Sequence, residues 1–221
     1  MKNKELEIKF ALHDPEQGHE VFSDQWIRTL IVPDTETTLP MRAVYYDDGS
    51  RSLAAGRIGY RVRKEGTEYI STLKWSAEKE TAGFSRRLEY NLPAEDETPD
   101  LEAFLPLLRE ETFPEAAELE ETLQSCGILK PLFISDCVRR LVEIRFGETL
   151  IELSCDTGAL SAGEKSEPVC ELECELKDGR EEDLKAFGEE LQQRFGLRPL
   201  NDSKLRRGLR LAEESAKAGL L

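Results

Sequence analysis

The chain has 221 residues, and its 45 Asp and Glu residues outnumber its 30 Lys and Arg residues, which gives a formal net charge of −15 at pH 7. This acidic balance argues against binding to duplex nucleic acid, which requires a basic surface to displace counterions. No apolar run reaches the roughly 18 residues of a membrane helix, and the residues after Met1 are charged and unlike a secretory signal. We therefore expect a cytoplasmic protein that binds neither duplex nucleic acid nor membrane.

Alternating charged and apolar residues dominate the first half of the chain. Over residues 5–10, three charged side chains fall on one face of an expected strand and three apolar side chains fall on the other. The stretch from His13 to His19 is expected to be a loop. Further short strands, separated by turns rich in Gly, Asp and Glu, are predicted at 43–46, 57–64, 69–75 and 87–92. These patterns favour antiparallel β structure.

A helical segment interrupts the strands in the middle of the chain. Thr98 can cap a helix whose first position is Pro99, and the helical pattern restarts near Pro114 and ends at about Gly127. Alternation then returns in three strands at 137–146, 149–155 and 169–176. Strands with this hairpin spacing are typical of a meander or a closed barrel.

Two helices are predicted near the end of the chain. The first runs from about Glu181 to Phe195 and is stopped by Gly196, and the second is capped by Ser203 and continues to about Lys217. The sequence contains no internal repeat and no linker long enough to separate domains. We therefore predict a single α+β domain over residues 1–221.

Charged residues share one face in strand after strand. Successive members of such a row lie roughly 6.6 Å apart. For one strand alone, a solvated face with ion pairs of about 0–1 kcal/mol each would explain the pattern. Repetition over six expected strands favours a polar interior. The acidic members of the rows are Glu5, Glu7, Glu152, Asp156, Glu171, Glu173 and Glu175, and the basic members are Lys9, Arg61, Arg63, Lys74 and Arg87.

An interior lined by both charges has a recognisable chemistry. Clustered carboxylates are hard oxygen ligands for Mg²⁺ or Mn²⁺, and magnesium is usually held by a few carboxylates together with phosphate oxygens and water. Arginine binds phosphate oxygens as a bidentate fork, and lysine binds them as a point charge. The residues therefore point to a site for a metal ion and a polyphosphate.

The charged rows belong to a series of short motifs along the chain. In chain order the motifs are Glu5-Leu6-Glu7-Ile8-Lys9, Tyr45-Tyr46-Asp47, Leu53 with Arg61-Val62-Arg63, Thr72-Leu73-Lys74, Arg87-Leu88-Glu89, Arg139, Ile151-Glu152 with Asp156 and Gly158, Glu171 to Leu176, and Ser203-Lys204-Leu205-Arg206-Arg207-Gly208. The order of these motifs resembles that of the CYTH domain family, also called triphosphate tunnel metalloenzymes. The last motif is similar to an element of the bacterial inorganic triphosphatases.

The resemblance extends from Glu5 to about Leu211 and implies both a fold and an activity. The implied fold is a closed eight-stranded antiparallel β-barrel that forms a tunnel, with peripheral helices and a C-terminal helix. It implies one CYTH-like triphosphate tunnel domain over residues 1–221, without the helical CHAD domain that often follows in bacterial triphosphatases. The implied activity is divalent-metal-dependent hydrolysis of a triphosphate.

The resemblance also implies roles for individual residues. Lys204 would complete the phosphate clamp or place the attacking water, and with Glu7 and Glu173 it is a candidate catalytic residue. Arg140 stands beside Arg139, so either could face the tunnel. Arg206, Arg207 and Arg210 are expected to form a solvated helix face. Phosphate oxygens would be bound by Lys9, Arg61, Arg63, Lys74, Arg87, Arg139 and Lys204, and Mg²⁺ or Mn²⁺ would be held by Glu5, Glu7, Asp156, Glu171 and Glu173.

The leading prediction is hydrolysis of inorganic triphosphate to pyrophosphate and phosphate, with a small-molecule triphosphate as the partner. One alternative is an organic triphosphatase acting on thiamine triphosphate or a nucleotide, or a class IV-type adenylate cyclase; such substrates need a stacking or hydrogen-bonding pocket beside the tunnel. Another alternative is a polyphosphate-binding module without activity. The two groups of acids expected to hold metal, at Glu5 and Glu7 and at Glu171 and Glu173, weigh against that module, because cations alone suffice to bind an anion.

Overall fold

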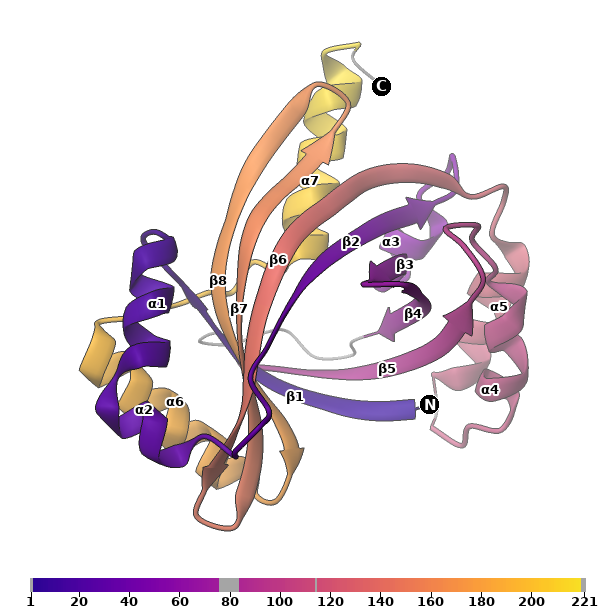
Figure 1. The fold of residues 1–221 in the computed structure, drawn as a ribbon. Coiled ribbons are helices and arrows are strands. Elements are labelled where there is room, and N and C mark those ends of the chain that lie inside the picture. Colours follow the sequence, from indigo (N-terminus) through magenta and orange to yellow (C-terminus); the bar gives the residue numbers. More distant parts are fainter. Residues whose placement is uncertain (1, 76–83, 114, 220–221) are drawn as a thin grey trace.

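The computed structural model describes residues 2–75, 84–113 and 115–219, with side chains for all of these except residues 2–4 and 84–87. The described strands form one antiparallel sheet that curves strongly (Figure 1). In chain order they are β1 (Lys2–Ala11), β2 (Thr37–Asp47), β3 (Ile58–Glu65), β4 (Glu68–Trp75), β5 (Phe84–Ala94), β6 (Lys130–Phe146), β7 (Thr149–Ala162), β8 (Lys165–Asp178) and β9 (Arg198–Pro199).

The predicted closed eight-stranded barrel is wrong for this structure. The sheet has nine strands in the order β5-β4-β3-β2-β6-β7-β8-β1-β9, because the short β9 is added beside the end of β1. β1 is divided along its length between two neighbours, since Lys2–Ile8 pairs with β5 and Glu7–Ala11 pairs with β8. Among the described residues, only Glu7 and Ile8 are paired to both strands. The sheet therefore lacks the even closure of a regular barrel.

Two groups of helices lie outside the curved sheet: α1, α2 and α6 near β1, and α4 and α5 beside β5 (Figure 1). The C-terminal helix α7 packs on β6, β7 and β8. No helix of the described residues is long and apolar enough to cross a membrane. In chain order the helices are α1 (Pro15–Ser23), α2 (Gln25–Leu30), α3 (Ser52–Ala55), the 3₁₀ helix η1 (Glu102–Phe104), α4 (Leu105–Arg109), α5 (Ala116–Ser125), α6 (Glu181–Phe195) and α7 (Lys204–Lys217).

The apolar faces of the strands point outward, toward these helices. One core cluster joins Phe10 of β1 to Phe187 of α6, and a second joins Tyr60 of β3 to Phe104 of η1 and Leu108 of α4. Each fully buried side chain of this kind contributes about 1.5–3 kcal/mol. Because side chains alternate along a strand, this outward packing leaves the charged rows on the concave face.

The stretch expected to be a loop after β1 is helical. Asp14 caps α1 by accepting a hydrogen bond from the backbone N–H of Gln17 at 3.0 Å, and Pro15 occupies the first turn. The side chain of Gln17 in turn accepts from the backbone N–H of His13 at 2.9 Å. These caps satisfy backbone donors that would otherwise be unpaired, so the helix forms despite Gly18 in its interior.

Glycine fixes the position of α7 on the sheet. A Cβ atom at Gly208 would lie 2.1–2.3 Å from ring atoms of Phe133 on β6, which no side chain allows. Ser203 caps the helix by accepting from the backbone N–H of Arg206 at 3.3 Å. The first turn of α7, which carries Lys204, is therefore held close to the sheet.

Candidate active site

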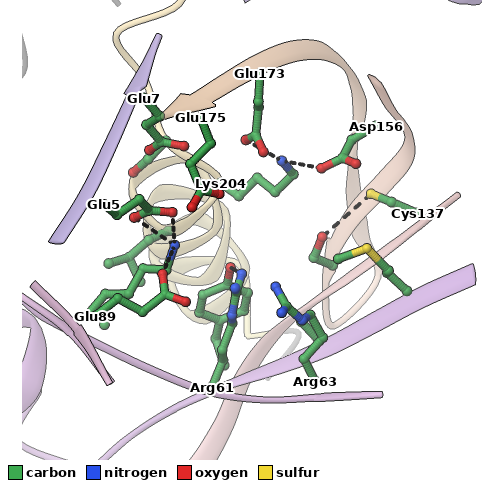
Figure 2. A pocket seen from close by; sticks show the side chains of 18 of the residues that line it. Glu5, Glu7, Arg61, Arg63, Glu89, Cys137, Asp156, Glu173, Glu175 and Lys204 are labelled. Carbon is green, nitrogen blue, oxygen red and sulfur yellow. Dashed lines mark hydrogen bonds and ion pairs between the residues drawn. The ribbon is translucent and has the colours of Figure 1, made fainter. Parts of the chain in front are cut away.

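The concave face of the sheet lines a cavity of about 580 Å³ (Figure 2). The charged side chains that line it come from strands far apart in the sequence, and α7 supplies part of the wall. They include Glu5, Glu7, Lys9, Arg61, Arg63, Lys74, Glu89, Arg139, Asp156, Glu173 and Lys204. Most of the residues predicted to share one interior space therefore lie together, although the sheet is not the predicted barrel; Glu171 does not line the cavity, and the side chain of Arg87 is outside the described part.

Strand register brings acids and bases next to one another. Lys9 of β1 stands opposite Glu173 of β8, and Arg139 of β6 stands opposite Asp156 of β7. Asp156 is in turn opposite Glu171 of β8. Directly opposed side chains have Cβ atoms about 4.5–5.5 Å apart, which is close enough for ion pairs between neighbouring strands.

One group of charges, the Lys204 cluster, consists of Lys204, Arg139, Asp156, Glu171 and Glu173. The ammonium of Lys204 lies 2.8 Å from Asp156 Oδ2 and 3.1 Å from Glu173 Oε1, and it also contacts Glu171 Oε1. Arg139 donates to both carboxylate oxygens of Asp156 and to Glu173 Oε2, each at 2.7 Å. Figure 2 shows the Lys204 ammonium between Asp156 and Glu173.

A second group, the Lys74 cluster, consists of Lys74, Glu5 and Glu89. Lys74 Nζ lies 2.7 Å from Glu5 Oε1 and 2.6 Å from Glu89 Oε2. Asn91 donates to the other oxygen of Glu89 at 2.5 Å and accepts from Thr72 at 2.7 Å. The amide of Asn91 therefore orients Glu89 toward the lysine.

Lys9 lies between the two clusters. Its ammonium is 2.9 Å from Glu7 Oε1 and 3.9 Å from Glu173 Oε1. Both the lysine and Glu7 are buried. Lys9 thus links the acidic row of β1 to the acidic row of β8.

Arg61 and Arg63 of β3 bring guanidinium groups to the opposite wall of the cavity (Figure 2). Arg61 donates to the hydroxyl of Tyr45 at 3.1 Å, and Arg63 pairs with Glu65 at 2.6 Å. The buried Nε–H groups of both arginines have no hydrogen-bond partner among the described residues. Leaving these buried donors unpaired costs about 1–3 kcal/mol each. The positive charges of the two guanidinium groups that line the cavity favour an anion there.

Burial and neighbouring charges shift the ionisation of these groups. Burial and the adjacent Glu7 raise the pKa of Glu5 to about 7. Burial also raises the pKa of Glu173, but Lys204 and Arg139 outweigh it and hold that pKa well below its usual range. Burial and the nearby Arg61 lower the pKa of Arg63 to about 10. Two cations therefore keep Glu173 ionised, whereas a single lysine does not offset burial and the neighbouring acids at Glu5, whose pKa lies near neutrality.

The carboxylates of the Lys204 cluster fit a divalent cation. Asp156, Glu171 and Glu173 each offer an oxygen within 4.8 Å of the others, and oxygen is the ligand that Mg²⁺ and Mn²⁺ prefer. Glu5 and Glu7, predicted as ligands of the same ions, line the same cavity but contact Lys74 and Lys9. The structure therefore brings three of the five predicted metal ligands into one group.

The structure answers the question left open at Arg139 and Arg140. Arg139 reaches the cavity, whereas Arg140 pairs with Glu36 at 2.5 Å and lies over the ring of Phe22 at 4.5 Å. Arg87 stands opposite Glu5 in the pairing of β5 with β1, but its side chain lies outside the described part.

Sequence reasoning missed two groups at the site. Arg207, expected on a solvated face, is buried and donates to Glu171 Oε2 at 3.1 Å. Its spacing was the available signal, because it is three residues after Lys204 and four before Leu211, on the same side of the helix. Tyr45, named from the sequence only as part of a family motif, both lines the cavity and accepts a hydrogen bond from Arg61.

Comparison with known proteins shows which family the chain belongs to. The sequence model of the CYTH domain matches residues 3–209. The chain belongs to the CYTH domain family. This membership confirms the family predicted from the order of the charged motifs. An inorganic triphosphatase of Haemophilus influenzae is 32% identical over 212 residues, which cover 96% of this CYTH chain and 56% of that protein.

Solved structures share the fold of this CYTH chain. A Hippeastrum protein, proposed to be an adenylyl cyclase and reported with a dominant triphosphatase activity, is 18% identical with a TM-score of 0.58, and the match covers 98% of this chain and 97% of that one. A Bacillus halodurans protein proposed to be an adenylate cyclase is 17% identical with a TM-score of 0.54, covering 93% and 97%. At such identities the likeness extends to the fold and not to the chemistry.

Proposed function

We propose that this CYTH chain hydrolyses a small-molecule triphosphate in a reaction that requires a divalent metal ion, and that inorganic triphosphate is the substrate cleaved to pyrophosphate and phosphate. The proposal treats residues 1–221 as one domain of the family. The observation that carries it is the cavity that Arg61 and Arg63 line on one wall and Asp156 and Glu173 line on the other, with Glu171 in the same carboxylate group. The inorganic triphosphatase of Haemophilus influenzae supports the choice of substrate.

The cations of the cavity would bind and align the triphosphate. Phosphoryl transfer depends on positioning and charge stabilisation more than on covalent chemistry. Arg61 and Arg63 line the cavity wall, so their guanidinium groups are suited to bind phosphate oxygens directly. The other proposed phosphate-binding residues are Lys9, Lys74, Arg87, Arg139 and Lys204.

Asp156, Glu171 and Glu173 would hold Mg²⁺ or Mn²⁺, with Glu5 and Glu7 on the neighbouring strand as further ligands. Such an ion, when bound, neutralises phosphate charge and acidifies water. Glu7 and Glu173 are proposed to orient the attacking water by accepting its hydrogen bonds. The ammonium of Lys204 would move from Asp156, Glu171 and Glu173 to a phosphate oxygen of the substrate.

A second candidate function rests on an apolar strip in the same cavity. Leu39, Met41 and Ala43 alternate along β2 and line the cavity, and Ala43 stands opposite Arg63. An apolar wall beside a phosphate-binding arginine favours an organic group on the triphosphate. The chain would then be an organic triphosphatase for a nucleotide or thiamine triphosphate.

Phosphate release separates these functions. The assay compares inorganic triphosphate, ATP and thiamine triphosphate in Mg²⁺, Mn²⁺ or EDTA. We expect the highest kcat/KM for inorganic triphosphate and no turnover in EDTA. A preference for an organic triphosphate would support the second candidate, and tight polyphosphate binding without any turnover would contradict both.

A further inference from the structure

Two cations from one turn of α7 contact the two oxygens of a single carboxylate. Lys204 contacts Glu171 Oε1, and Arg207 donates to Glu171 Oε2 at 3.1 Å. Residues three apart on a helix lie on the same face, which explains why both reach the same strand. Glu171 is 1% exposed, so both contacts are made in the interior.

Arg207 is tied to β8 by more than this contact. Its Nε donates to Glu167 Oε1 at 2.7 Å, and its Nη2 donates to the carbonyl oxygen of Pro168 at 2.6 Å. The guanidinium thus has three partners within five residues of one strand. Arg210, one turn later, is exposed and pairs with Asp202 at 3.1 Å and with Glu167 at 3.7 Å. It has no ion pair with Glu171 among the described residues, so the same helix offers a solvated arginine for comparison.

The two contacts on Glu171 differ in kind. Lys204 is a single ammonium shared among three carboxylates, which are also the group that fits a divalent cation. A metal ion and the ammonium would therefore compete for the same oxygens. Arg207 holds the other oxygen of Glu171 from outside that group, because it does not contact Asp156 or Glu173 in the interactions of the described residues.

We propose that Arg207 is a positioning residue that holds Glu171 by Oε2 and so keeps Oε1 directed at the metal ion, while Lys204 leaves that oxygen when the ion binds. This inference rests on the proposed function, since it concerns the same metal site. Groups that orient metal ligands in this way commonly change metal affinity by 10–100-fold when removed. A guanidinium suits the task because its fork bonds several oxygens in fixed directions.

The test is Mn²⁺ binding to the whole chain, measured by isothermal titration calorimetry without substrate. We expect Arg207→Gln to weaken Mn²⁺ binding about 10–100-fold, Arg207→Lys to recover part of the loss, and Arg210→Gln to match the wild type. At saturating Mn²⁺, the KM of Arg207→Gln for triphosphate should stay near that of the wild type, which a general loss of structure would not allow.

A second variant keeps the inference testable if Arg207→Gln does not fold. Glu167→Gln removes another partner of Arg207 and leaves Glu171 intact, and we expect it to weaken Mn²⁺ binding several-fold. Wild-type affinity in folded Arg207→Gln, with normal binding by the wild type, would overturn this inference alone. Absence of Mn²⁺ binding by the wild type itself would overturn the metal-dependent function as well.

Discussion

Arg139 and Asp156 face each other across β6 and β7 and form a two-pronged ion pair, with both N–O distances at 2.7 Å. Asp156 is 1% exposed. Removing one partner of a buried ion pair leaves the other charge buried without compensation, which destabilises the fold. This pair therefore supports the fold as well as the cavity.

Arg139→Met is expected to lower the free energy of unfolding by roughly 3 kcal/mol at pH 7, the low end for a buried pair because Lys204 still contacts Asp156. Urea unfolding followed by tryptophan fluorescence measures the change. The matched control is Arg140→Met, which breaks a pair with Glu36 nearer the surface and should cost about 1 kcal/mol or less. Equal losses in the two variants would contradict this account.

Lys204→Gln is expected to have opposite effects on metal binding and on turnover. Without the ammonium, Asp156, Glu171 and Glu173 lose a competitor, so Mn²⁺ should bind more tightly in the absence of substrate. Loss of a charged donor to the phosphates should lower kcat by roughly 10²-fold. Calorimetry and phosphate release measure the two quantities. Weaker Mn²⁺ binding by this variant would exclude Lys204 as the competitor.

Glu173→Gln is expected to abolish metal-dependent turnover while the fold persists, and Glu7→Gln should do the same. Both changes keep the size of the side chain and remove a charge that a divalent cation needs. Circular dichroism checks the fold, and Glu190→Gln, in an exposed pair with Arg194, is the control. Normal activity in either cavity variant would remove that residue from the proposed metal site.

Asp48 lies away from the cavity, and its hydrogen bonds predict that the stability of the fold depends on pH. Its carboxylate accepts from the backbone N–H groups of Ser50, Ser52 and Gly127, each at 2.9 Å, and from the Ser52 hydroxyl at 2.7 Å. These hydrogen bonds, those of Ser52 first, lower the pKa of Asp48 in the folded chain. Its stabilisation is therefore present above the unfolded pKa of about 3.9 and is lost as the pH falls below it.

Asp48→Asn should cost about 2 kcal/mol at pH 7, the range for hydrogen bonds to a charged group. The difference from the wild type should shrink as the pH falls below about 4. Urea unfolding at both pH values measures it, with the exposed Asp178→Asn as control. A difference that stays constant with pH would mean that the charge of Asp48 does not stabilise the fold.

The charged interior was predictable from the sequence because a strand has a period of two. Glu5, Glu7 and Lys9 had to share a face, and only their repetition in other strands indicated that this face was interior. The pairing of β1 was not predictable in this way. Period alone does not say that one half of a strand pairs with β5 and the other half with β8.

Two errors have identifiable physical causes. The helix α1 was signalled by Asp14 and Pro15, but Gly18 and the polar composition outweighed that capping signal in the sequence reading. Arg207 was placed on the solvated face because charged residues usually are. Its burial depends on Glu167, Pro168 and Glu171 of β8, which only the tertiary structure brings to the helix.

The most direct test of the central claim is a crystal structure with Mn²⁺ and a non-hydrolysable triphosphate analogue, in which anomalous scattering locates the metal. We expect manganese bound to Asp156, Glu171 and Glu173, with phosphate oxygens contacting Arg61 and Arg63. Manganese or analogue bound outside this cavity, with the Lys204 cluster unchanged, would contradict it.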